Sequence, residues 1–73
     1  MLTELQKAIL EYARRESFHA TVKDFIDCNG VSETAVLNAL KDLSSKRIVA
    51  LSPDIMNSWI GVTNHGWNLM GWR

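Results

Sequence analysis

The chain has 73 residues, of which 47% are hydrophobic, and its eight basic side chains balance eight acidic ones to a formal net charge of zero. This length predicts a single domain over residues 1–73 with a small core, which a second copy of the chain could help to stabilise. A net charge of zero argues against tight non-specific binding to nucleic acid, unless the cations cluster on one face.

The single cysteine, Cys28, rules out a disulfide within the chain and is typical of proteins in a reducing cytosol. No apolar run approaches the roughly 20 residues that span a membrane. The chain enters an amphipathic helix without the pattern of a signal peptide. We therefore expect a cytoplasmic protein.

Catalytic and metal-binding chemistry find little support in the residue pattern. Cys28, His19 and His65 lack the paired spacing of zinc ligands, so no metal site is predicted. No nucleophile stands in a recognisable triad, and no glycine-rich phosphate loop is present. We expect neither an enzyme nor a cofactor.

The first two predicted helices are marked by their caps. Residues 4–16 form a helix that Thr3 caps together with Gln6, three residues later. Phe18, in the connector after it, could dip into the core. Thr21 is expected to cap a second helix, with Asp24 at the reciprocal position. That helix ends near Cys28, because the following Asn29–Gly30 tolerates the left-handed conformation of a helix C-cap.

A third helix, from Ser32 to about residues 45–47, completes a helix-turn-helix pattern. Ser32 is its predicted N-cap. One stripe of the helix is apolar and should face the core. Its members are Val36, Ala39, Leu40 and Leu43. The opposite stripe is polar, with Leu37 on its border, and contains Thr34, Asn38, Lys41 and Ser45.

The period of the pattern then changes from helix to strand. Residues 48–51 and 59–62 read as two short strands that a turn-rich loop joins into a β-hairpin. Thr63 or Asn64 could cap a last helical turn or two, although two glycines weaken that helix. The three tryptophans should fill the core between the hairpin and the first helix, or a dimer interface. Trp59 is the strongest core candidate, and Trp72 is the strongest candidate for contact with a partner.

Three helices followed by a hairpin resemble a winged helix. The stretch from Gly30 to Leu43 resembles the helix-turn-helix of bacterial and phage winged-helix transcriptional regulators. The continuation Lys46–Val49 resembles the junction to the first wing strand. Residues 62–66 resemble the exit from the second wing strand in MarR-like and PadR-like regulators. The resemblance implies an α+β, mainly α, fold: a three-helix bundle with a hairpin wing and a short C-terminal helical turn.

The resemblance also implies sequence-specific binding to double-stranded DNA, with the third helix in the major groove. On this reading the outward residues of that helix and its N-cap contact bases, and nearby cations contact phosphates. The candidate base readers are Ser32, Thr34, Leu37, Asn38 and Lys41, and the candidate phosphate contacts are Lys23, Lys46 and Arg47. Because the cations are few, dimerisation or another partner is expected to add affinity.

An alternative hypothesis assumes the same fold but a different function, namely binding to a protein. The predicted wing, from Ser52 to Ser58, contains no Lys or Arg, and its tip carries Ile55 and Met56. An apolar wing suits a protein contact, whereas a DNA-contacting wing is usually basic. Ile55, Met56 and Trp72 are therefore candidates for a protein interface, and the chain could be an interaction or dimerisation module. Equally, Ile55 and Met56 could fold back onto the core.

Overall fold

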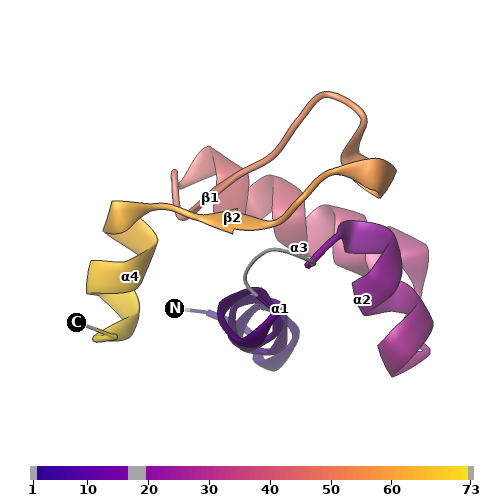
Figure 1. The fold of residues 1–73 in the computed structure, drawn as a ribbon, viewed down its shortest axis with the longest axis horizontal. Coiled ribbons are helices and arrows are strands. Elements are labelled where there is room, and N and C mark those ends of the chain that lie inside the picture. The colour runs from indigo at the N-terminus through magenta and orange to yellow at the C-terminus, as the bar shows by residue number, and fades with distance from the viewer. Residues whose placement is uncertain (1, 17–19, 73) are drawn as a thin grey trace.

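Four α-helices and a two-stranded hairpin form the described parts of the chain, residues 2–16 and 20–72, in the computed structural model (Figure 1). In chain order the elements are α1 (Glu4–Arg15), α2 (Val22–Asn29), α3 (Glu33–Ser45), β1 (Val49–Ala50), a 3-10 turn η1 (Ile55–Asn57), β2 (Gly61–Val62) and α4 (Asn64–Met70). The predicted class is confirmed: the fold is mainly α, with the order of elements of a winged helix. Phe18 and His19 lie outside the described residues.

The predicted caps set the helix boundaries. The hydroxyl of Thr3 accepts the backbone N–H of Gln6 at 3.1 Å, and the Gln6 side chain accepts the N–H of Thr3 at 3.0 Å, which completes a capping box. Thr21 and Ser32 accept the N–H groups three residues later in α2 and α3. Gly30 ends α2 at a φ of +61°, as expected for a residue that closes a helix in the left-handed region.

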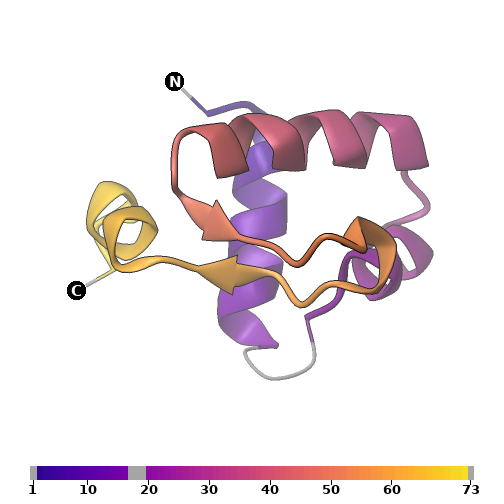
Figure 2. The same ribbon diagram turned by 90° about the horizontal axis from the view of Figure 1, so that it is seen from above.

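The core lies where α1 crosses beneath α3 and the hairpin (Figure 2). The inward stripe predicted for α3 is confirmed, since all four of its residues are buried. The α1 side chains that meet it are Ile9, Leu10, Tyr12 and Ala13. The ring of Tyr12 packs edge-on against that of Phe25 from α2, with 5.4 Å between ring centroids. These contacts bury one face of each of the first three helices.

The hairpin pairs Val49 with Val62 and Ala50 with Gly61, so its strands are shorter than the sequence predicts. A third extended segment joins it before α2. Ile60 donates its N–H to the carbonyl of Ala20 at 2.7 Å, and Val22 donates to the carbonyl of Ser58 at 3.1 Å. The hairpin is therefore tied to the start of α2 as well as to the end of α3.

The loop between the strands folds back toward α2, where η1 packs (Figure 1, orange). Ile55 and Met56 are half-buried and pack against the core. The predicted wing tip therefore contributes part of its apolar surface to the fold and exposes the remainder.

The prediction that Trp59 belongs to the core is wrong, because 54% of this residue is exposed. Successive side chains of an extended segment point to opposite faces. Ser58 and Ile60, on either side, are buried at 2% and 3% exposure, so Trp59 must point outward. The other two tryptophans meet beside α1. Trp67 and Trp72 pack edge-on with 5.2 Å between ring centroids, and the Arg14 guanidinium lies 4.8 Å from the Trp72 ring.

Gly66 has a packing role that its low helix propensity does not indicate. It is buried in the first turn of α4, where Thr63 caps the helix by accepting its N–H at 3.0 Å. A Cβ atom on Gly66 would stand 2.5 Å from the carbonyl oxygen of Ile48 and 2.9 Å from a methyl group of Val62. The missing side chain therefore lets α4 lie directly against the hairpin.

We expect Gly66→Ala to destabilise the chain by roughly 1–3 kcal/mol, because overpacking outweighs the gain of about 1 kcal/mol in helix propensity. Urea unfolding followed by circular dichroism measures the change. Asn68→Ala, at an exposed position of the same helix, is the matched control and should stay within about 0.5 kcal/mol of the wild type. Wild-type stability in Gly66→Ala would show that α4 does not pack as described.

Candidate nucleic-acid interface

The outward face of α3 is the polar surface that the sequence predicts. Thr34, Asn38, Lys41 and Ser45 are all exposed, and Leu37 on their border is half-buried. Ser32 precedes the helix as its N-cap and is also exposed. Because the opposite stripe is buried in the core, a ligand can reach α3 only from its exposed side, which includes this polar stripe.

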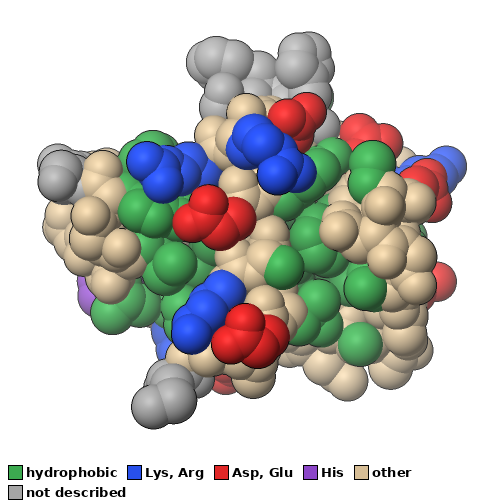
Figure 3. Space-filling model, turned by 90° about the horizontal axis from the view of Figure 1, so that it is seen from below, with side chains coloured by type: hydrophobic (Ala, Val, Ile, Leu, Met, Phe, Trp, Pro, Cys, Tyr) green, Lys and Arg blue, Asp and Glu red, His purple; other side chains and the backbone are tan. Residues whose placement is uncertain are grey.

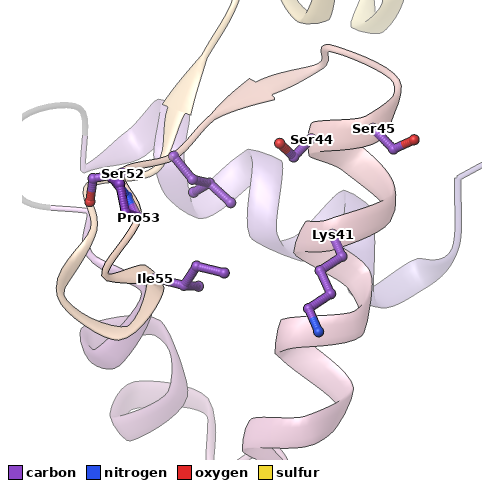
Figure 4. Close-up of a pocket in the computed structure, with 7 residues that line it drawn as sticks. Lys41, Ser44, Ser45, Ser52, Pro53 and Ile55 are labelled. Atoms are coloured by element: carbon purple, nitrogen blue, oxygen red, sulfur yellow. The ribbon is translucent and has the colours of Figure 1, made fainter.

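Beside this face lies a groove between α3 and the loop after β1, with a volume of about 480 Å³ (Figure 4). The helix contributes polar side chains, and the loop contributes mostly apolar ones. The lining residues are Lys41, Ser44 and Ser45 from α3, and Leu51, Ser52, Pro53 and Ile55 from the loop. The groove thus combines one ammonium group and three hydroxyls with an aliphatic wall.

The sequence did not single out Ser44 or Ser52 for this surface. Ser44 follows the buried Leu43, and Ser52 stands at the predicted start of a loop. The backbone N–H of Ser52 donates to the buried hydroxyl of Ser58 at 2.8 Å, which holds this part of the loop in place. The serine-rich composition of both segments was the available signal, but only the folded loop brings them together.

The predicted phosphate contacts do not converge on this groove. Lys23 is exposed on α2, and Lys46 and Arg47 lie at the C-terminal end of α3. The Lys46 ammonium stands 3.2 Å from Oδ2 of Asp42 and lines a different cleft, with Leu2 and Lys7. Among the described residues that line the groove, Lys41 is therefore the single cation.

Arg47 occupies a backbone conformation that usually belongs to glycine, with a φ of +61°. Its N–H donates to the carbonyl of Ser44 at 3.0 Å, and the N–H of Ile48 donates to that of Leu43 at 2.9 Å. These two bonds form a Schellman motif, the usual end of a helix. The hydroxyl of Thr63 donates to the Arg47 carbonyl at 2.6 Å and fixes the turn from the other side.

Asp42 connects the interior of the fold to these cations. Its Oδ2 atom accepts a 2.8 Å hydrogen bond from the side-chain amide of Gln6. This bond, and then the nearby ammonium of Lys46, lower the pKa of Asp42 below its ordinary value. The carboxylate is therefore charged at neutral pH and competes with any external anion for Lys46.

Neither metal ligation nor membrane insertion has structural support in the described residues. No group of three or more His, Cys, Asp or Glu side chains there could hold a metal ion. In the same part of the chain, no helix combines the length and the apolarity needed to cross a bilayer. Comparison of the chain with protein-family models, curated proteins and solved structures finds no match.

The lowered pKa of Asp42 predicts a pH-dependent contribution to stability. The contribution should be fully present above the ordinary pKa of 3.8 and should disappear as pH falls through the lower pKa of the folded state. We expect wild type to exceed Asp42→Asn in unfolding free energy at pH 7, with the difference shrinking below about pH 3.8. Urea unfolding across this pH range measures it.

Glu11→Gln, which removes an exposed carboxylate from α1, is the control for the loss of one negative charge. A difference between wild type and Asp42→Asn that stays constant from pH 7 to acid would contradict the described role of Asp42.

Proposed function

We propose that the chain binds double-stranded DNA through α3 and acts as a transcriptional regulator of the bacterial or phage winged-helix type. The observation that carries the proposal is the exposed polar stripe of α3, which continues into the groove beside the loop after β1. A helix of this kind, held by its buried face and preceded by a tight turn, suits insertion into a major groove.

The side chains on the stripe have the chemistry of base recognition. The amide of Asn38 can donate to and accept from the edge of an adenine, and Lys41 can reach a guanine or a phosphate. Leu37 offers an apolar contact of the kind that suits a thymine methyl group. The hydroxyl of Ser32 accepts the N–H of Ala35 and keeps its own proton free to donate to a phosphate.

The groove suits the sugar–phosphate backbone of one strand. The hydroxyls of Ser44, Ser45 and Ser52 can donate to phosphate oxygens, while Leu51 and Pro53 can pack against deoxyribose. Neutral donors release no counterions when they contact phosphates. Even if Lys23, Lys41, Lys46 and Arg47 all bind phosphates, the logarithm of affinity should fall with that of salt with a slope no steeper than about −3.6 per copy.

A protein-interaction module is the second candidate, and the composition of the wing favours it. The segment from Ser52 to Ser58 contains no cation, and Glu33 opens α3 with a negative charge. However, η1 and α4 lie at opposite ends of the molecule (Figure 1). Ile55 and Met56 would therefore serve a different contact from Trp72, which is half-buried beside Arg14.

Selection of bound sequences from a random DNA pool, followed by fluorescence anisotropy at several salt concentrations, tests the proposal. We expect Lys41→Met to weaken binding to the selected site about tenfold or more and to make the salt slope shallower by about 0.9. Arg15→Met removes an exposed cation from the far end of α1 and should leave both quantities unchanged. No binding at low salt would overturn the proposal, and so would a Lys41→Met protein that binds like wild type.

Loss of a groove hydroxyl should affect DNA binding differently from loss of the Lys41 charge. Ser45→Ala and Ser52→Ala should each weaken binding several-fold, because a neutral donor to phosphate is lost, while the salt slope stays the same. The same titrations measure both quantities. Unchanged affinity in both variants, with Lys41→Met still defective, would contradict phosphate binding by these two hydroxyls and leave Lys41 as the groove residue that contacts DNA.

A further inference from the structure

A second cleft lies just past the C-terminal end of α3, where the start of α1, the end of α3 and α4 meet. Its volume is about 360 Å³. Most of its wall is aliphatic, and two ammonium groups stand among the lining residues, which are Leu2, Lys7, Lys46, Ile48, Leu69 and Met70. Leu69, which lines the cleft, is 54% exposed and is therefore available for an apolar contact.

The charges beside this cleft come as pairs of opposite sign. Lys7 stands 3.8 Å from Glu4 on α1, and Lys46 stands 3.2 Å from Asp42 on α3. On the side of the molecule drawn in Figure 3, hydrophobic side chains at the α4 end lie next to such mixed charges. A nucleic acid or an acidic peptide would meet attraction and repulsion in equal measure here.

A second copy of the same chain fits this pattern. A two-fold axis brings identical patches together, so the ammonium groups of one copy can face the carboxylates of the other. The formal net charge of zero also leaves no long-range repulsion between copies. The exposed Leu69 of each copy can enter the largely aliphatic cleft of the other.

We infer that this cleft is a self-association surface, in which each of two copies seats its Leu69 in the cleft of the other. The cleft lies beside α4, at the end of α3 opposite to Ser32 and Thr34 (Figure 2). The dimer therefore leaves the N-terminal half of the exposed α3 stripe accessible. If the proposed function is correct, the dimer presents two such helices, each with its own Lys41, to one DNA duplex.

Sedimentation equilibrium of the whole chain without DNA, from micromolar to millimolar concentration, tests the inference separately from DNA binding. We expect a reversible dimer for the wild type. Leu69→Glu should raise the dimer dissociation constant at least tenfold while circular dichroism shows an intact fold, since the side chain is largely exposed. Lys7→Glu should also weaken the dimer, because it places like charges at the interface.

Trp59→Glu is the matched control, since Trp59 is equally exposed but lies outside the cleft, and its dimer should persist. A wild-type chain that stays monomeric throughout overturns the inference. It is equally overturned if Leu69→Glu dimerises like wild type, or if folded Trp59→Glu is the variant that dissociates. A monomer that binds DNA would contradict the self-association surface alone, whereas a dimer without DNA affinity would contradict the proposed function alone.

Discussion

The side-chain amide of Gln6 fixes the position of α3 relative to α1, and the rest of the structure packs on these two helices. It is 96% buried within the α1–α3 interface; its Nε2 atom donates to the carbonyl of Ala39 at 3.3 Å and to Asp42 at 2.8 Å. Its oxygen accepts the N–H of Thr3 at the start of α1. A shift of α3 along α1 would leave the buried Nε2 atom without its two α3 partners, at a cost of roughly 1–3 kcal/mol. The amide thus helps to determine which face of α3 reaches solvent.

The same contact influences how the cations are distributed. Because Gln6 holds Asp42 beside Lys46, the charge of Lys46 at the C-terminal end of α3 is offset by a carboxylate. Lys41 lies in the groove, and among the described residues its ammonium forms no ion pair with a carboxylate. The fold therefore gives α3 two different surfaces. One is the polar face beside the groove, with the hydrogen-bond donors Lys41, Ser44 and Ser45. The other is the C-terminal end beside α4, where apolar side chains lie next to the Lys46–Asp42 ion pair. Different partners suit these surfaces.

Much of the fold could be predicted because its signals are local. A cap such as Thr3 or Ser32 acts on the next turn of its own helix, and Gly30 meets a conformational need at its own position. The buried stripe of α3 follows from helical periodicity alone. Gln6 could be recognised as a capping residue but not as a buried one, because its partners lie more than 30 residues away in sequence.

The remaining differences also arise from long-range packing. The orientation of Trp59 depends on how the extended segment before β2 pairs with the segment before α2. The hydrophobicity of Trp59 predicts a buried side chain, whereas this pairing turns it toward solvent. Gly66 looked like a weak point in a helix because the nearby carbonyl of Ile48 belongs to another element. In the candidate site, the exposed stripe followed from periodicity, whereas the groove depends on how the loop after β1 folds back.

We propose that the polar face of α3 and its adjoining groove form a DNA-binding surface. Backbone amide NMR during titration with a selected DNA duplex tests it most directly, because it locates the contact residue by residue. We expect the largest shifts at Thr34, Asn38, Lys41, Ser45 and Ser52. Shifts confined to α4 or to η1, or no shifts at low salt, would contradict the claim.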